Sequence, residues 1–145
     1  MIRISRMTIV TIIFMLCLSG LVLSGTAFAQ QCVDNGDGTI TDNGAGLMWQ
    51  KATNGLMDWN TAMSYASGLS LGGHSDWRLP NRDELKGLYN SECKKLMEVR
   101  RDWYWSSTTY ASDTDYAWFV DFNYGGTSGY SKSYNYFVRA VRDVQ

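Results

Sequence analysis

The spacing of apolar residues changes from a helical to a strand period along this chain, and this change constrains the fold more than any other feature. Between Asp58 and Leu69 apolar residues recur at three- and four-residue intervals, which predicts an amphipathic helix. A second helix is expected where Asn81 and Glu84 have the spacing of a capping box. From Trp103 onward, apolar and polar residues alternate instead, as they do in strands. Helices and strands in separate stretches are typical of an α+β domain.

Turn chemistry predicts the remaining strands. The stretch 34–42 contains Asn-Gly and Asp-Gly pairs, which favour the positive φ of hairpin turns. We therefore expect a hairpin with strands at about 38–42 and 47–50, ahead of the helices. After the helices we expect strands at 103–109, 115–123 and 134–142. The predicted fold class is α+β, with an N-terminal β-hairpin, two helices and then an antiparallel sheet.

The first 29 residues have the layout of a secretory signal peptide. Two arginines precede an apolar run from Met7 to Leu23, and Ala27 and Ala29 fit the two small positions before a cleavage site. A retained anchor helix is one alternative, and lipidation of the cysteine inside the run is another. Cleavage after Ala29 would leave a single domain, residues 30–145, that does not span a membrane and is secreted, periplasmic or at the cell surface.

The charge balance excludes some partners. The chain has 13 Lys and Arg against 14 Asp and Glu, so bulk positive charge cannot hold a polyanion. Nucleic acid is therefore not an expected partner. Aromatic residues make up 14% of the chain, which is typical of a folded domain and not of a disordered one.

Two cysteines, Cys32 and Cys93, follow the predicted cleavage site. In an exported domain such a pair predicts one disulfide, here closing a loop of about sixty residues. The alternative is two free buried thiols. There is no Cys-x-x-Cys motif, so neither thiol redox catalysis nor a zinc ribbon is indicated.

Residue types that enzymes and metal sites use are scarce. The single histidine, His74, is followed directly by Ser75 and Asp76, and consecutive residues cannot converge as a hydrolytic triad. The aspartates of 34–42 do not match a calcium loop, because Gly36 stands where a ligand is needed. We therefore predict no catalytic residues, no metal and no cofactor.

Four stretches form a recognisable combination: 34–42 with Gly-Leu-Met-Trp-Gln-Lys at 46–51, 69–81 with its Asp-Trp-Arg-Leu-Pro, Tyr-Trp-Ser-Ser-Thr-Thr at 104–109, and Val-Arg-Ala-Val-Arg at 138–142. Together they resemble the bacterial domain of unknown function 1566, also named after the C-terminal domain of the Legionella collagen-like adhesin. The resemblance spans about 34–142.

This resemblance implies a C-type-lectin-like fold, akin to that of the formylglycine-generating enzymes. In the collagen-like adhesin the domain trimerises and binds sulfated glycosaminoglycans. No Gly-X-Y repeat precedes the domain here, so trimerisation by a stalk is not implied, and a homo-oligomer stays an open alternative. The resemblance further implies structural roles for Trp49, Trp77, Arg78, Trp105, Arg139 and Arg142.

Two surfaces are candidates for ligand binding. The first, the tyrosine-rich surface, mixes aromatic and small polar residues as binding surfaces do, and its candidate residues are Tyr110, Trp118, Asn123, Tyr124, Tyr130, Lys132 and Tyr134. The alternative is a sheet that uses tyrosine for cross-strand pairs. The second, the basic loop, consists of Lys94, Lys95, Arg100 and Arg101. Its alternative is a solvated loop, since three acidic residues lie within or beside it.

These observations predict an exported, non-enzymatic domain that binds a glycan, including a sulfated one, or another surface polymer. The alternative is a module that binds a protein or peptide of the cell envelope through the same aromatic residues. A third hypothesis is a degenerate relative of the formylglycine-generating enzymes, which would require a reactive thiol.

Overall fold

The computed structural model describes residues 30–145, and the predicted signal peptide at 1–29 lies outside them. The helices of this part are α2 (Trp59–Ser67), α3 (Arg82–Asn90) and a short 3₁₀-helix, η1 (Glu92–Leu96). None of them is long and apolar enough to cross a membrane. The strands are β1 (Cys32–Asp34), β2 (Thr39–Asp42), β3 (Leu47–Gln50), β4 (Asn54–Met57), β5 (Trp103–Thr109), β6 (Tyr116–Asp121), β7 (Thr127–Ser131), β8 (Tyr136–Val138) and β9 (Val141–Asp143).

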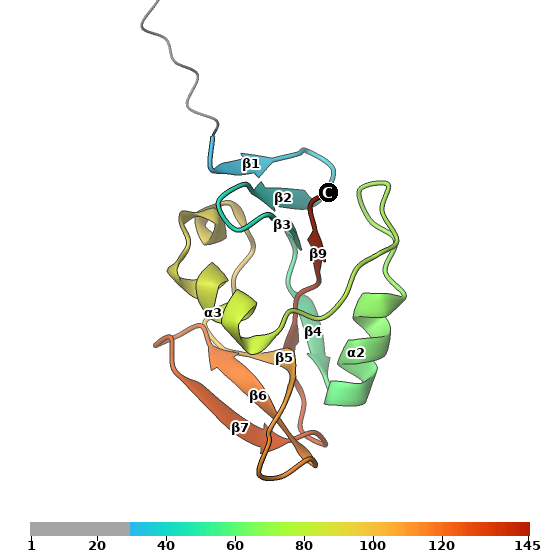
Figure 1. Cartoon of the computed structure of the whole chain (residues 1–145), viewed down its shortest axis with the longest axis vertical. Coiled ribbons are helices and arrows are strands. Elements are labelled where there is room, and N and C mark those ends of the chain that lie inside the picture. The colour runs from blue at the N-terminus through green and yellow to red at the C-terminus, as the bar shows by residue number, and fades with distance from the viewer. Residues whose placement is uncertain (1–29) are drawn as a thin grey trace, which may run out of the picture.

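The strands form two sheets, and the chain is α+β as predicted (Figure 1). The first sheet has the order β1-β2-β3-β9 and is antiparallel throughout. The second has the order β4-β8-β5-β6-β7, and its one parallel pair is β5 with β8. The predicted single antiparallel sheet is therefore replaced by two mostly antiparallel ones.

Local signals begin each of the two α-helices where the sequence predicts it. The Asp58 side chain accepts a hydrogen bond from the Thr61 amide at 2.9 Å and begins α2. Asn81 and Glu84 form both halves of a capping box at the start of α3, each bond 2.8 Å long. The predicted hairpin is also confirmed, because β2 pairs with β3 within a residue of the expected bounds.

The predicted single strand over 134–142 is wrong. The chain instead forms β8 and β9, which belong to different sheets. Between them the Arg139 side chain is buried and its guanidinium donates to the carbonyls of Gln50 and Lys51. The Ala140 amide donates to the Gln50 side chain at 3.1 Å. These contacts hold the backbone where it passes from one sheet to the other.

Three strands have no counterpart in the sequence prediction: β1, β4 and β7. All three lie at sheet edges. An edge strand buries few side chains, so it need not show the alternation that marks a half-buried strand. Gly55 in β4 and Gly129 in β7 weaken the strand pattern further.

Each helix covers its own hydrophobic core. The core under α3 contains Trp49, Tyr104 and both disulfide cysteines. The core under α2 contains Trp77 and Trp105. All three tryptophans are almost fully buried, as the large side chains that fill a core should be.

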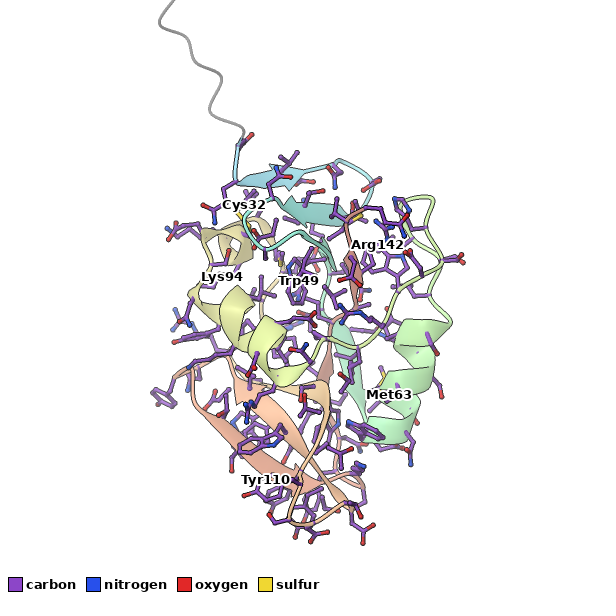
Figure 2. The ribbon with its side chains drawn as sticks, viewed as in Figure 1. Cys32, Trp49, Met63, Lys94, Tyr110 and Arg142 are labelled. Carbon is purple, nitrogen blue, oxygen red and sulfur yellow. A yellow bond between two sulfur atoms is a disulfide. The ribbon has the colours of Figure 1, made fainter. Side chains whose placement is uncertain are left out.

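Cys32 and Cys93 form a disulfide, which confirms the predicted pairing over two free thiols (Figure 2). Their Cα atoms lie 5.2 Å apart, and both residues are buried. The bond joins β1 to η1. Because η1 carries Lys94 and Lys95, the disulfide also fixes the start of the basic loop against the first sheet.

Candidate ligand-binding site

A pocket of about 380 Å³ lies where the basic loop meets the turn between β6 and β7. It is lined by Tyr89, Lys94, Val99, Arg101, Phe122 and Asn123. Lys94 and Arg101 come from the basic loop, and Asn123 comes from the tyrosine-rich surface. The structure therefore joins part of each candidate surface in one site, which we term the basic pocket. None of its six lining residues is acidic.

Lys94 is held at the basic pocket by the end of α3 (Figure 2). Its ammonium donates to the backbone carbonyl of Tyr89 and lies 4.3 Å from the centre of the Tyr89 ring. A lysine ammonium has three N–H donors. One hydrogen bond thus leaves two donors for a ligand, and the aromatic face orients the charge without neutralising it.

The Tyr89 ring is fixed by close approach of the β6–β7 turn. Gly125 in this turn has a φ of +78°, and a Cβ there would overlap the Tyr89 ring. Phe122 meets the same ring edge-on, with the ring centres 5.6 Å apart. Lys86, which precedes Tyr89 by three residues in α3, donates to the Gly125 carbonyl. Glycine is required at this position for both its conformation and its size.

Arg101 and Asn123 reach the basic pocket from two loops. Arg101 is exposed and forms no ion pair with any residue of 30–145. The backbone N–H of Asn123 donates to the Asp121 side chain at 2.7 Å, and this hydrogen bond fixes the turn. The Asn123 side chain is exposed. Tyr124 follows and is 82% exposed. Two cations, an amide and aromatic edges are groups that bind sulfate or carboxylate.

The other two residues of the basic loop do not line this pocket. Lys95 pairs with Glu92 one turn earlier in η1, and this hydrogen bond lowers the pKa of the Glu92 carboxyl. The Arg100 amide donates to the Tyr104 hydroxyl at 2.8 Å, while its side chain is exposed. The four cations of the loop therefore do not act as one patch.

The tyrosine-rich surface divides into packed and exposed parts. Tyr110 and Trp118 pack with ring centres 4.8 Å apart, and the guanidinium of Arg82 lies 4.8 Å from the centre of the Trp118 ring. A Cβ on Gly129 would overlap the Tyr110 ring. Tyr110 and Trp118 are half-buried in these contacts, which hold β7 against β6, its neighbour in the sheet, and against the residue that follows β5.

Lys132 is also engaged within the fold. Its ammonium lies 4.1 Å from the centre of the Trp59 ring and donates to the Thr109 hydroxyl at 3.1 Å and the Thr114 carbonyl at 2.8 Å. These contacts tie the turn after β7 to α2. They use two of the three donors that a lysine has.

Two exposed tyrosines of this surface, Tyr130 and Tyr134, continue a row of rings that also contains the exposed Trp103 and the buried Tyr136. We term this row, in the order Trp103, Tyr136, Tyr130 and Tyr134, the aromatic strip. Ring centres of successive members lie 5.3, 6.3 and 4.6 Å apart. Trp103, Tyr130 and Tyr134 are 39%, 40% and 52% exposed. Tyr136 is buried, and this burial raises the pKa of its hydroxyl to about 12. Sequence reasoning missed Trp103, although its alternation with the buried Tyr104 could have placed it outward.

Arg78 and Arg142 both form ion pairs within the domain. Arg78 donates to both carboxylate oxygens of Glu84 at 2.8 Å. Arg142 contacts both oxygens of Asp76, at 2.6 and 3.0 Å, and this contact lowers the pKa of the Asp76 carboxyl. The two pairs tie the loop before α3 to the helix itself and to β9.

The described residues form a disulfide-linked α+β domain whose candidate site consists of cations, an amide and aromatic rings, as in ligand-binding domains. The chain belongs to the Lcl C-terminal domain family, whose model matches residues 38–142. This match confirms the resemblance noted from the sequence, and membership indicates an adhesin-like domain. No curated protein matches the chain.

Proposed function

We propose that this protein is an exported, non-enzymatic domain of C-type-lectin-like fold that binds an anionic glycan or a similar anionic surface polymer. The observation that carries the proposal is the basic pocket, which Lys94, Arg101 and Asn123 line together and where the Lys94 ammonium lies against the Tyr89 ring. Family membership supports the lectin-like fold and the adhesin-like role.

Sulfate and carboxylate groups are matched by the chemistry of this pocket. Hydrogen bonds from a charged donor to an anion are about twice as strong as those between neutral groups. The net charge of the chain is −1, so attraction must come from the local cations and not from the protein as a whole. Binding of this kind weakens steeply as salt screens the charges.

Binding of heparin to the purified protein, measured between low and physiological salt, tests this assignment. The variant Lys94→Gln with Arg101→Gln should bind at least tenfold more weakly and with a flatter dependence on salt. Glutamine at 94 can still donate to the Tyr89 carbonyl, so the fold should be retained. The matched control is Lys95→Gln with Arg100→Gln, which removes the same charge from neighbouring positions outside the pocket.

The control should keep most of the affinity of the unchanged protein. Equal losses in the two double variants would show that only total charge matters, and would refute the pocket. No binding of heparin by the unchanged, folded protein would refute the proposed anionic ligand.

The aromatic strip supports a second candidate function, binding of a neutral glycan or of a protein or peptide of the cell envelope. Its three exposed rings offer apolar area with little conformational freedom to lose. Binding there should resist salt and be lost in Tyr130→Ala with Tyr134→Ala. Tyr124→Ala, which removes an exposed tyrosine outside the strip, is the control. Loss in the control alone would exclude the strip.

The disulfide and the family are consistent with an extracellular protein. We further propose secretion, or retention in the periplasm or at the cell surface, after cleavage near Ala29, and a homo-oligomer stays open. The enzymatic hypothesis requires a reactive thiol, and both described cysteines are joined in the disulfide. Mass spectrometry of the exported protein tests both points, through its N-terminal residue and through thiol labelling without reductant.

A further inference from the structure

The second sheet ends in β7, and this edge differs from the other edges of the two sheets. An open edge presents unpaired backbone groups to other chains, so most proteins shorten, bend, charge or cover their edge strands. In the part of the chain that the structure describes, β7 forms one side of the second sheet, with no strand beyond it (Figure 1).

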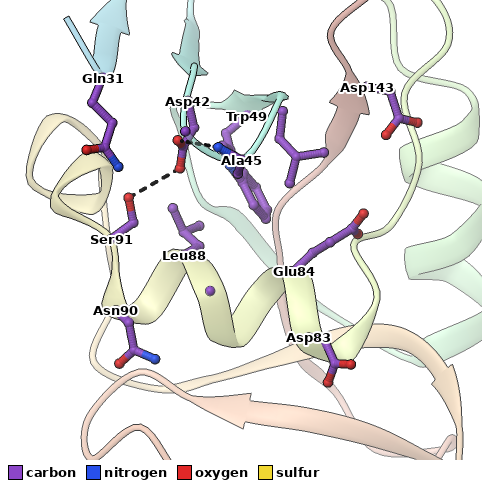
Figure 3. Close-up of a pocket in the computed structure, with 13 residues that line it drawn as sticks. Gln31, Asp42, Ala45, Trp49, Asp83, Glu84, Leu88, Asn90, Ser91 and Asp143 are labelled. Carbon is purple, nitrogen blue, oxygen red and sulfur yellow. Dashed lines mark hydrogen bonds between the residues drawn. The ribbon is translucent and has the colours of Figure 1, made fainter.

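Within residues 30–145, the other three edges are protected by the fold. β1 has three residues and is joined to η1 by the disulfide. β4 is interrupted by a shift in register between Asn54 and Met57. Arg78 covers the outer side of β9, where it exchanges backbone hydrogen bonds of 2.9 Å with Val141. The Arg78 side chain also donates to Asp143, at the end of β9 beside a pocket of about 540 Å³ (Figure 3).

β7 lacks these protections. Its sequence, Thr-Ser-Gly-Tyr-Ser, contains no charged residue and no proline. All five residues pair with β6 without a shift in register. Lys132 follows the strand, but its ammonium is held by Trp59, Thr109 and Thr114 inside the domain. A regular, uncharged edge is the kind to which another strand can add.

The free backbone groups of β7 belong to alternate residues. In an antiparallel pair, residues that bond to the neighbouring strand alternate with residues that turn away from it. The Trp118 carbonyl of β6 accepts from the Ser106 hydroxyl of β5 at 2.6 Å, so it points away from β7. Gly129 lies opposite Trp118, and its N–H and C=O therefore point outward from the sheet. The same alternation turns the N–H groups of Thr127 and Ser131 outward.

These outward groups suit a second copy of the same strand. Thr127 and Ser131 lie equally far along the strand on either side of Gly129. Two copies of β7 can therefore pair antiparallel about a two-fold axis at Gly129, with each Thr127 opposite Ser131 of the other copy. Free donors then meet free acceptors on both strands, and no like charges face each other.

Side-chain size fits this register as well. Ser128 of each copy would lie opposite Tyr130 of the other, so that a small side chain faces a large one. Ser128 is the cross-strand neighbour of Phe119, whose ring stacks on Trp103 with the ring centres 4.8 Å apart. The exposed Tyr130 ring of one copy would thus continue the aromatic strip of the other.

We infer that β7 is an interface between two copies of this chain, which pair antiparallel at Gly129 and join their second sheets into one. The inference does not rest on the proposed binding of an anionic glycan, because the basic pocket is lined by residues outside β7. Each copy in the dimer keeps its own basic pocket.

Sedimentation equilibrium and hydrogen exchange of the purified protein test the inference. The mass should rise from that of one chain to that of two, and not beyond, as the protein concentration is raised. The amides of Thr127 and Gly129, which face solvent in a single copy, should exchange roughly tenfold more slowly at the higher concentration. The amides of Ser128 and Tyr130 bond to β6 in both states and are the internal control.

Two charge variants test the register. Thr127→Glu with Ser131→Glu places like charges opposite each other in the dimer, and so does Thr127→Lys with Ser131→Lys. Each variant alone should dimerise roughly tenfold more weakly, whereas an equal mixture of the two should dimerise at least as strongly as the unchanged protein. Asn60→Glu with Ser64→Glu adds the same charge to exposed positions of α2 and is the matched control.

The inference is overturned if the unchanged protein stays a single chain at every concentration or assembles beyond two chains. It is also overturned if concentration leaves the exchange of the Thr127 and Gly129 amides unchanged, if both charge variants dimerise as the control does, or if mixing them restores no dimer. An extended peptide that protects these amides while the protein stays a single chain would show that β7 binds another polypeptide instead.

Discussion

The buried guanidinium of Arg139 gives the sharpest test of how this fold is held together. The side chain is 1% exposed and donates to three backbone carbonyls, of Gln50, Lys51 and Glu98, and to the Thr53 hydroxyl. Burial lowers the pKa of Arg139, because the charged form loses its hydration. The group thus joins the loop after β3, the loop after η1 and the passage between the two sheets.

Replacing Arg139 by methionine keeps the apolar stem and removes all of these donors. A buried acceptor left without a donor costs about 1–3 kcal/mol, so four acceptors would set a high upper limit if Arg139 were the only partner of each. The Lys51 carbonyl, however, also accepts from the Glu98 amide, and the Glu98 carbonyl also accepts from the Thr53 hydroxyl. Relaxation of the loops lowers that limit, and the variant no longer has to bury a charge. Hydrogen bonds to a charged group contribute about 1.5–3 kcal/mol each, and after relaxation we expect a net loss of about 3–5 kcal/mol here. Domains of this size have a total stability of about 5–15 kcal/mol.

Urea unfolding, followed by tryptophan fluorescence, measures the effect of Arg139→Met. With a denaturant slope of about 2 kcal/mol per molar, the midpoint should fall by about 2 M. Arg100→Met is the matched control, because that side chain is exposed, and its free energy of unfolding should change by less than about 0.5 kcal/mol. A fall of less than about 0.5 M in Arg139→Met would show that the network contributes little to the fold.

Three further perturbations test other parts of the structure. Gly125→Ala should lower the free energy of unfolding by about 2–4 kcal/mol, since the positive φ and the Tyr89 ring both oppose a Cβ. Gly126→Ala, whose Cβ would meet nothing within 4 Å, should change it by less than about 0.5 kcal/mol, and equal urea midpoints for the two variants would contradict this. The Arg142 contact lowers the pKa of Asp76, so the pair stabilises the fold above the ordinary value of 3.8 and loses this effect as pH falls through the lower folded-state pKa. The difference in midpoint between the unchanged protein and Asp76→Asn should therefore be present near about pH 7 and should shrink as pH falls below 3.8, and a difference independent of pH would exclude the mechanism. Reducing the disulfide should lower the free energy of unfolding by about 4 kcal/mol, and an unchanged Tm in reductant would rule out this contribution.

Features that depend on a few neighbouring residues are predictable from this sequence. The two helices begin at Asp58 and Asn81 because a cap needs only one side chain and the amides two or three residues later. The β2–β3 hairpin follows from its turn residues for the same reason. β5 also follows from its pattern, since three of its seven residues are buried.

Features that depend on distant partners are not predictable in this way. The apolar residues of 134–142 are typical of a strand, but the stretch continues through Arg139, whose guanidinium donates to carbonyls about ninety positions earlier in the chain. No local signal shows that these carbonyls lie nearby. The pattern therefore cannot show that β8 joins one sheet and β9 the other.

The division of the basic loop has a simple geometric cause. Lys94 and Lys95 are neighbours in η1, and successive residues of a 3₁₀-helix point about 120° apart. One ammonium therefore turns toward the Tyr89 ring, whereas the other turns back to Glu92. The sequence shows two adjacent lysines and cannot distinguish them without knowing which face of η1 meets α3.

The basic pocket also depends on a residue that its own pattern assigns to the core. Tyr89 lies at the end of the apolar stripe of α3, so packing is its expected role, and it does meet Phe122. Because Gly125 lets the β6–β7 turn approach, the same ring also forms a wall of the pocket and holds Lys94. The clue in the sequence is therefore Gly125, a residue with no side chain. A glycine required both for its φ and for its size shows where a turn closes on a ring, and in this domain that contact brings the two candidate surfaces together.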